Sequence, residues 1–188
     1  MPPKVKVTRA HIIAAAVEIV RQSGAQTLNA RTVAVALGCS TQPVFSNFES
    51  MEMLKLAVVE QADALCQEYI RREIEQGQYP EYKASGMAYI RFAKEEKELF
   101  KLLYMRDRAN ESVPAEMELG SQMEHVVQRA TGLQMADAKL FHLEMWACVH
   151  GIATMFATGY LDLDWALVSD MLTDFYQGIK WRKNHECN

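Results

Sequence analysis

The sequence predicts an all-α protein with about nine helices, and three features support this fold class. Apolar residues recur at helical spacing, three and four positions apart, along most of the 188-residue chain. Glycine, proline and small polar residues stand between these stretches, where helices begin and end. No segment shows the apolar–polar alternation of a β-strand or the turn signal of a hairpin. The expected architecture is an N-terminal three-helix head followed by a C-terminal helical bundle.

The first two expected helices have recognisable ends. Thr8 can cap the first helix, because its hydroxyl can accept a hydrogen bond from an N–H group of the first turn. Gly24 can end that helix in a left-handed turn. Asn29 can cap the second helix, and Gly38 follows its last apolar position. Both helices therefore carry a start signal and a stop signal.

The third expected helix is short and the other six are longer. Ser40 can cap the third helix, which runs to about Asn47 with Pro43 in its first turn, where a missing N–H is tolerated. Residues 106–113 read as a loop, and Pro114 fits the first position of the seventh helix. The expected ranges of the last six helices are 50–76, 80–94, 96–105, 114–131, 137–159 and 164–181.

Composition excludes several classes of protein. Hydrophobic residues make up 49% of the chain and charged residues 23%, which are ordinary values for a globular protein. The longest stretches without Asp, Glu, Lys or Arg, 32–48 and 145–161, fall short of the roughly 20 apolar residues of a membrane span. The first residues hold no apolar signal core, and the four cysteines show no metal-site spacing. We therefore expect a cytoplasmic protein without a membrane partner, a metal or another cofactor.

Charge is unevenly distributed along the chain. Residues 1–50 contain five basic and two acidic side chains, a net charge of +3. Residues 51–188 contain fifteen basic and twenty-two acidic side chains, a net charge of −7, so the whole chain carries −4. A basic end on an acidic body suggests that the first 50 residues face a polyanion, although a difference of this size also arises by chance.

The second and third expected helices are joined by the tripeptide Gly38-Cys39-Ser40. Two short helices joined by a short turn that contains glycine form the helix-turn-helix pattern. In that unit the second helix enters the major groove of DNA, and its N-terminal residues meet the edges of the bases. The spacing therefore indicates double-stranded DNA as a partner, although other helical proteins contain such a turn.

Residues on both sides of this turn match a known family. They are Leu28–Ala34, Leu37–Ser40, Val44–Ser50 and Leu54, and the first expected helix at 10–24 matches as well. Together these stretches resemble the DNA-binding domain of the TetR family of transcriptional regulators, over roughly residues 8–56. A shorter stretch, Trp146–Gly151, resembles the Trp…His-Gly signature of one TetR subgroup. The resemblance implies a helical DNA-binding head and a helical body.

Three positions depart from the pattern of the family. Phe45 stands where the family usually has a tyrosine whose hydroxyl binds a phosphate, and Met51 stands where it usually has a lysine. Pro43 occupies a position where a small residue is common. Since no basic residue lies between Arg31 and Lys55, we expect weak non-specific DNA binding with a shallow dependence on salt.

The pattern and the resemblance together assign candidate DNA contacts. Helix N-termini can offer N–H groups to phosphates, Gln or Asn can bond an adenine edge, and the methyl group of Thr can contact thymine. Base reading is expected from Thr41, Gln42 and Asn47, and phosphate binding from Arg31 and the N-terminal arm. The full candidate set is Lys4, Lys6, Arg9, Asn29, Arg31, Ser40, Thr41, Gln42, Pro43, Phe45 and Asn47.

The family resemblance also implies an effector pocket enclosed by the fourth to eighth helices. The chain supplies bulky aromatic, methionine and histidine side chains there, and the pattern points no charged cluster inward, so a small, mostly apolar or aromatic effector is expected. Plain core packing explains the same residues: Trp146 is then a core residue whose change to Ala costs ~3–5 kcal/mol, and His150 bonds a hydroxyl or carbonyl. The candidate set is Tyr69, Phe92, Phe100, Tyr104, Met123, His142, Met145, Trp146 and His150.

The last two expected helices are apolar on more than one face, so each must be buried on more than one side. Small residues in the eighth helix, among them Ala147 and Gly151, would let another helix approach closely. The family resemblance implies that these two helices form a four-helix bundle with a second subunit, and a two-fold homodimer would read a pseudo-palindromic operator. The alternative is that the small residues ease packing inside one subunit.

No catalytic motif is present in the sequence. It contains no HExxH, P-loop, GxGxxG or GxSxG pattern, and no histidine follows a glutamate at the spacing of di-iron helical proteins. We therefore predict a transcriptional regulator rather than an enzyme, most simply a repressor, with a DNA-binding domain at 1–50 and an effector-binding and dimerisation domain at 51–188. Two alternatives stay open: a helical protein–protein interaction module, and a DNA binder without an effector.

Overall fold

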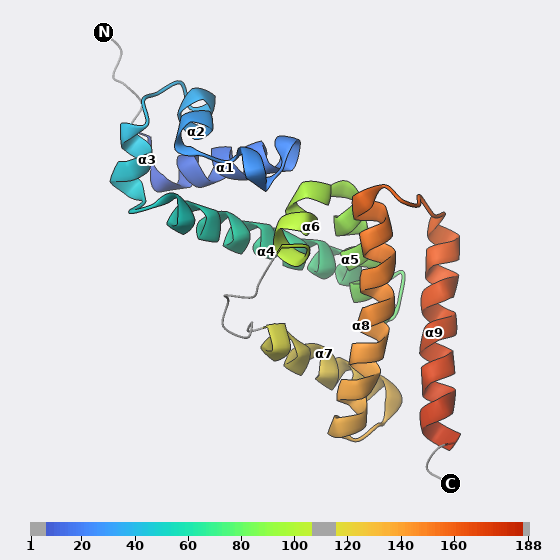
Figure 1. Ribbon diagram of the computed structural model, residues 1–188. Coiled ribbons are helices and arrows are strands. Elements are labelled where there is room, and N and C mark those ends of the chain that lie inside the picture. Colours follow the sequence, from blue (N-terminus) through green and yellow to red (C-terminus); the bar gives the residue numbers. More distant parts are fainter. Residues whose placement is uncertain (1–6, 107–115, 186–188) are drawn as a thin grey trace. The chain divides into compact units, whose positions relative to one another are not determined.

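The structure of the protein, a computed structural model, is built from α-helices (Figure 1). It describes residues 7–106 and 116–185, without the side chains of residues 116–122. These residues contain no strand, and the all-α prediction is confirmed. In order, the elements are α1 (Arg9–Ser23), the single 3-10 turn η1 (Ala25–Thr27), α2 (Ala30–Ala36), α3 (Gln42–Asn47), α4 (Met51–Gln76), α5 (Glu81–Glu95), α6 (Lys97–Tyr104), α7 (Glu116–Thr131), α8 (Met135–Thr158) and α9 (Trp165–His185).

The described residues form two compact units. The head unit contains the residues up to Cys66 together with Glu96–Arg106. The body unit contains Gln67–Glu95 together with the described residues from Glu116 onward. Helix α4 therefore contributes residues to both units, and α6 belongs to the head unit. The functional boundary expected at residue 50 stays a prediction.

The first two helices of the head unit start where the sequence supplies a cap. The Thr8 hydroxyl accepts a hydrogen bond from the backbone N–H of His11 at 3.3 Å, and the His11 ring accepts one from the N–H of Thr8. Oδ1 of Asn29 accepts bonds from two N–H groups at the start of α2, each at 3.0 Å. These bonds satisfy donors that a helix start leaves without an intrahelical partner, and both predicted caps are confirmed.

Helix α3 begins later than the sequence predicts. Ser40, the expected cap, lies in the turn before α3, and Thr41 precedes the helix without a side-chain bond to its first turn. Pro43 occupies that first turn, as predicted. Because proline has no N–H, it removes one of the donors that a cap would satisfy. The expectation that Ser40 caps α3 is therefore wrong.

The core of the head unit is apolar and draws on most of its helices. The end of α1 is joined to the start of α6 by an ion pair, in which Nε of Arg21 lies 2.7 Å from Oε2 of Glu96. Core packing and this ion pair together hold the helices of the head unit against one another, and α1 packs on α6. Large buried side chains of the unit include Ile12, Val20, Val33, Val44, Phe48, Leu54, Val58, Leu99 and Phe100.

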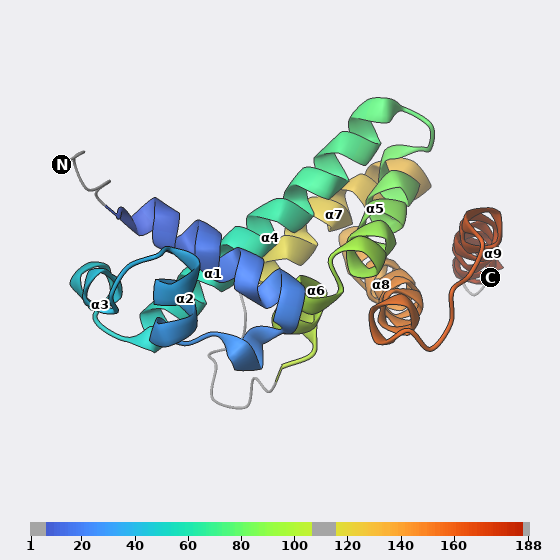
Figure 2. The same cartoon turned by 90° about the horizontal axis from the view of Figure 1, so that it is seen from above.

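Helix α8 is the centre of the body unit and packs against α5, α7 and α9 (Figures 1 and 2). Its buried residues Phe141 and Met145 form an apolar cluster with side chains of α5, α7 and α9. Gly86 of α5 permits a close approach of these helices: a Cβ atom there would lie 3.3 Å from Cγ2 of Val149 and 3.4 Å from Cδ1 of Leu172. The three helices therefore meet at a position where a larger residue would crowd them.

The ends of the later helices differ from the predicted ranges. Helix α8 begins at Met135 rather than at residue 137, and α9 continues past residue 181 to His185. Pro114 lies outside the described residues, as does the expected loop beyond Arg106. Over residues 7–106 and 116–185, α8 is the one helix that is long and apolar enough to suit a membrane span. The core helix of a soluble protein passes the same test, and α8 packs on three helices of its own unit.

Candidate nucleic-acid interface and effector region

The turn between α2 and α3 is closed by backbone hydrogen bonds. The N–H of Cys39 donates to the carbonyl of Ala34 at 3.0 Å, and the N–H of Gly38 donates to the carbonyl of Val35 at 3.1 Å. Gly38 has a φ of 62°, a left-handed conformation that favours glycine. The turn sets α3 at an angle to α2, which is the arrangement of a helix-turn-helix (Figures 1 and 2).

Helix α3 presents a polar and aromatic face to solvent. Thr41, Gln42 and Phe45 are exposed, and Phe45 shows 55% of its surface. Val44 and Phe48 are buried in the core of the head unit instead. The predicted base readers Thr41 and Gln42 therefore lie on an accessible face, and Phe45 lies beside them.

Asn47 and Arg9 have partners inside the head unit. Nδ2 of Asn47 donates to the carbonyl of Pro43 at 2.8 Å, and the Asn47 carbonyl accepts a bond from Nη1 of Arg9 at 3.2 Å. The Arg9 guanidinium also lies 4.1 Å from the centre of the Phe48 ring. These contacts join the start of α1 to the end of α3, across a sequence separation of 38 residues. DNA contacts by Arg9 and Asn47 stay predictions.

The other candidate DNA contacts differ in their exposure and in their hydrogen bonds within the protein. Arg31 and Ser40 are exposed. Both polar atoms of the Asn29 amide are hydrogen-bonded within the head unit. Oδ1 caps α2, and Nδ2 donates to the carbonyl of Thr27 at 3.1 Å. Lys4 and Lys6 of the N-terminal arm lie outside the described residues.

The nine effector candidates fall in both units. Phe100 and Tyr104 belong to the head unit, where their ring centroids lie 5.0 Å apart. The others belong to the body unit, and they are Tyr69, Phe92, Met123, His142, Met145, Trp146 and His150. A single pocket lined by all nine stays a prediction.

Two tyrosine–histidine pairs join α5 to α8 in the body unit. Oη of Tyr82 lies 2.9 Å from Nδ1 of His142, and Oη of Tyr89 lies 3.0 Å from Nδ1 of His150. His150 therefore has the hydroxyl partner expected of a core histidine. Burial lowers the pKa of both histidines, because an uncharged imidazole is easier to remove from water. The indole of Trp146 stacks on the His150 ring with centroids 4.8 Å apart.

Trp146 is not a core residue of the body unit. Its exposed fraction is 43%, whereas Phe141 and Met145 fill the buried face of α8. Helical periodicity shows that α8 is apolar around much of its circumference, but it does not show which face meets the rest of its own unit. The cost of 3–5 kcal/mol expected for Trp146→Ala is therefore too large for an isolated subunit, since only part of that side chain is buried.

The contact between α4 and α5 contains a buried acid that the sequence pattern does not reveal. The rings of Tyr69 and Phe92 meet edge to face with centroids 5.5 Å apart. One turn further along α4, Glu73 is 3% exposed, and its Oε2 lies 3.4 Å from Nε of Arg91. Its other oxygen, Oε1, has no hydrogen-bond partner among the described residues. The Arg91 guanidinium in turn lies 4.7 Å from the ring centre of Trp165.

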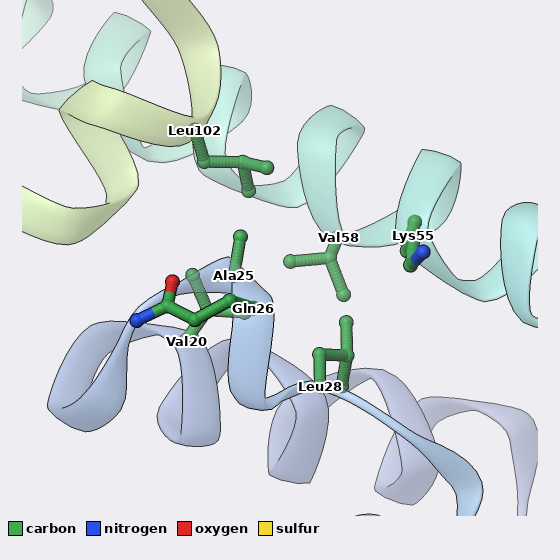
Figure 3. Close-up of a pocket in the computed structure, with 7 residues that line it drawn as sticks. All are labelled: Val20, Ala25, Gln26, Leu28, Lys55, Val58 and Leu102. Atoms are coloured by element: carbon green, nitrogen blue, oxygen red, sulfur yellow. The ribbon is translucent and has the colours of Figure 1, made fainter. Parts of the chain in front are cut away.

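A cavity of about 250 Å³ lies within the head unit (Figure 3). Figure 3 shows α1 and η1 on one side of it and α4 and α6 on the other. Its walls are mostly apolar, and none of its lining residues is a predicted effector contact. The lining residues are Val20, Ala25, Gln26, Leu28, Lys55, Val58 and Leu102.

Candidate metal ligands and the buried thiol of Cys66 are the remaining groups of chemical interest. In the parts of the chain that are described, no group of three His, Cys, Asp or Glu side chains is placed to hold a metal ion. Burial raises the pKa of the Cys66 thiol to about 12, and Tyr104 donates a hydrogen bond to it at 3.8 Å. Such a thiol is a core group rather than a nucleophile.

The fold and the exposed helix together define a class of protein. A helix-turn-helix in a chain built of helices is typical of DNA-binding transcriptional regulators. A family model for the C-terminal domain of tetracyclin repressor-like proteins matches residues 82–175, half of the chain. The chain belongs to the TetR family, and it is a DNA-binding transcriptional regulator, not an enzyme.

Solved structures share this fold. A TetR-like transcriptional regulator from Rhodococcus sp. RHA1 is 15% identical, with a TM-score of 0.66 over 97% of this chain and 97% of that chain. A TetR family member from Streptomyces coelicolor is 18% identical, with a TM-score of 0.62 over 89% of this chain and 96% of that one. The multidrug binding protein EbrR, whose structure was solved in complex with imidazole, is 18% identical. Its TM-score is 0.62 over 89% of this chain and 88% of that chain. Among curated proteins, no sequence matches the chain.

Proposed function

We propose that the protein is a repressor that binds a pseudo-palindromic DNA operator as a homodimer and is released by a small, mostly apolar or aromatic effector. In this proposal residues 1–50 bind DNA, and residues 51–188 bind the effector and the second subunit. The observation that carries it is the exposed face of α3, where Thr41, Gln42 and Phe45 stand clear of the head-unit core. In a helix-turn-helix the second helix is the element that enters the major groove, and α3 holds that place here.

The charges around α3 support modest affinity for the DNA backbone. No Lys or Arg occurs from residue 32 to residue 54, so few phosphates can be neutralised by the recognition helix itself. Arg31 and Lys55 flank this segment and are both exposed. Each phosphate contact that is absent makes the binding constant less sensitive to salt. We therefore expect hydrogen bonds and apolar contacts to carry a large share of the binding free energy.

The surface of α8 and α9 supports the homodimer. Several large apolar side chains on these two helices are exposed in the single chain, and exposed apolar surface is typical of protein interfaces. A two-fold pairing of these helices from two subunits would bury exposed side chains of this kind. These side chains are Leu140, Leu143, Trp146, Leu167, Phe175 and Trp181.

The interior of the body unit supports an uncharged effector. The buried Glu73 is paired with Arg91, so the charge of this carboxylate is matched by that of its partner. The aromatic rings of Tyr69 and Phe92 lie next to that pair on the same two helices. A flat, uncharged molecule would match such surroundings, and Oε1 of Glu73 could accept one hydrogen bond from it.

Release by the effector requires a difference in affinity between two conformations. The effector must bind more tightly to the conformation that does not bind the operator, and the operator then weakens effector binding by the same factor. Helix α4 contributes residues to both units and directly follows α3 in the chain, so a displacement of its body-unit end is passed along α4 into the head unit. We propose α4 as the element that links the two events.

Selection of binding sites from a random duplex-DNA pool at low salt tests the proposal. We expect an enriched inverted repeat, and we expect the protein to leave that operator when a suitable aromatic compound is added in a fluorescence anisotropy assay. The double variant Thr41→Ala, Gln42→Ala is the matched control, because both side chains are exposed and the variant should fold but enrich nothing. A folded dimer that enriches no sequence would favour the interaction module. An operator from which no compound releases the protein would favour a DNA binder without an effector.

A further inference from the structure

We propose that Phe45 recognises the C5-methyl group of a thymine in each half of the bound DNA site. The inference rests on the DNA-binding function of the head unit and adds a specificity-determining residue to it. Phe45 is 55% exposed, whereas its neighbours Val44 and Phe48 are 1% and 2% exposed and fill the core. The ring of Phe45 is therefore not what holds α3 in place.

Phe45 is the one exposed aromatic side chain of α3, and its exposed neighbours on that helix are polar. Thr41 and Gln42 precede it by four and three residues, the spacing that places side chains side by side on a helix, and both are exposed. The hydroxyl of Ser46 donates to the Gln42 carbonyl at 2.9 Å, so that side chain is turned back onto the helix. No cation lies between residues 32 and 54. A partner that meets this face meets one aromatic ring beside neutral hydrogen-bonding groups.

The chemistry of a phenyl ring restricts what it can recognise in DNA. The ring has no atom that can bond to a phosphate or to the polar edge of a base, and it gains free energy by covering apolar surface. Among the groups that base pairs present in the major groove, the apolar one is the C5-methyl of thymine, and Phe is one of the side chains that contact it. A Phe45 ring carried into the groove by α3 therefore favours thymine, while Thr41 and Gln42 lie where they can bond an adjacent base edge.

Replacing thymine by deoxyuridine tests this assignment, because uracil differs from thymine only in lacking the methyl group. In the operator obtained by selection, each thymine is replaced singly, and the dissociation constant of the full-length protein is measured by fluorescence anisotropy at one salt concentration. We expect one thymine in each half-site at which the replacement weakens binding about three- to tenfold, the effect of losing one covered methyl group. Replacement at the remaining positions should leave the dissociation constant unchanged.

Variants of α3 connect the effect to the ring. Phe45→Ala should bind thymine and uracil equally at the sensitive position, and Phe45→Tyr, which keeps the ring, should retain the difference. Thr41→Ser is the matched control, because it removes a methyl group from the same helix face and leaves Phe45 in place. An unchanged thermal midpoint of Phe45→Ala shows that the head unit is folded, as its exposure predicts. If Phe45→Ala binds too weakly to measure, Phe45→Leu takes its place, with a reduced difference between the two bases expected.

Four results would overturn the assignment. Two concern the DNA: no replacement of a thymine by deoxyuridine weakens binding, or the weakening is the same in Phe45→Ala. The other two concern the protein: Thr41→Ser abolishes the difference between thymine and uracil, or Phe45→Ala changes the oligomeric state. The last result would assign the ring to a protein contact. Specific binding without any uracil effect refutes the inference alone. Failure to select any DNA refutes the proposed function and the inference together.

Discussion

The hydroxyl oxygen of Tyr89 lies 3.0 Å from Nδ1 of His150, and this contact joins α5 to α8. About two turns along the same pair of helices, Tyr82 and His142 repeat it at 2.9 Å. The two contacts are therefore parallel cross-links between helices that also share an apolar core. Burial lowers the pKa of both imidazoles, so the folded body unit favours their neutral form.

These pairs predict that the body unit loses stability in mild acid. The unfolded chain binds a proton on each histidine near the ordinary pKa of 6.5, whereas the folded chain resists protonation until a lower pH. Below 6.5 the unfolded state therefore binds more protons, and the free energy of unfolding falls as the pH falls through this window. Glu124 acts in the opposite direction on His142, but burial is the larger influence and the pKa of His142 stays lowered.

Urea denaturation at about pH 7.5 and about pH 5.5 measures this effect. The double variant His142→Gln, His150→Gln is the matched control, since each amide can still bond a tyrosine hydroxyl but does not titrate. The wild-type midpoint should fall more than the variant midpoint between the two pH values. Equal falls would show that carboxylates elsewhere account for the whole acid sensitivity.

A second prediction concerns the ion pair between Arg21 and Glu96. The Glu96 side chain is 13% exposed and that of Arg21 is 38% exposed, so the pair lies between a surface pair and a buried one. The hydrogen bond to Glu96 raises the pKa of Arg21, in keeping with an engaged partner. We expect Glu96→Gln to lower the free energy of unfolding by about 1–2 kcal/mol, above the about 0–1 of surface pairs and below the about 3–5 of buried ones.

Arg21 also contacts Glu18 at 2.9 Å, on the exposed side of α1. Glu18→Gln is therefore the control within the same network, and we expect it to change stability by less than about 0.5 kcal/mol. Chemical denaturation of both variants and of the double variant separates the two contributions. A larger effect of Glu18→Gln than of Glu96→Gln would contradict the assignment of Glu96 as the stabilising partner.

A third prediction separates the roles of Gln42 and Asn47. The side chain of Gln42 is exposed and makes no hydrogen bond within the described residues, so Gln42→Ala should weaken operator binding by ~1–3 kcal/mol without changing stability. The half-buried Asn47 donates to the Pro43 carbonyl at 2.8 Å. We therefore expect Asn47→Ala to lower the free energy of unfolding by about 0.5–1.5 kcal/mol. Operator titrations and urea midpoints of both variants decide the matter, and a destabilised Gln42→Ala would remove that residue from the DNA face.

Local signals in the sequence predicted the helices well, because a cap and a stop act within one turn. Asn29 and Gly38 illustrate this, since each acts on backbone groups a few residues away. Contacts between residues that are far apart in the sequence have no local pattern from which they could be predicted. The bond from Arg9 to the Asn47 carbonyl spans 38 residues, and the buried Glu73 depends on an arginine of another helix. Periodicity could place Phe45 on α3, but its exposure required the packing of the whole head unit.

The last prediction concerns Trp146 and the proposed homodimer. Because 43% of this side chain is exposed in the single chain, Trp146→Ala should lower the stability of an isolated subunit by less than the about 3–5 kcal/mol of a core aromatic. If α8 and α9 pair with a second subunit, the same change removes a large aromatic side chain from the interface. Truncating such a residue at the centre of an interface costs about 2 kcal/mol or more, so we expect the dissociation constant of the dimer to rise at least about tenfold.

Sedimentation over a range of protein concentrations measures the dissociation constant of this dimer. Tyr160→Ala is the control, because Tyr160 is an exposed aromatic residue beyond the end of α8, and this change should leave the constant unchanged. A wild-type protein that stays monomeric throughout, or a Trp146→Ala variant that dimerises as tightly as the wild type, would remove this surface from the proposed dimer.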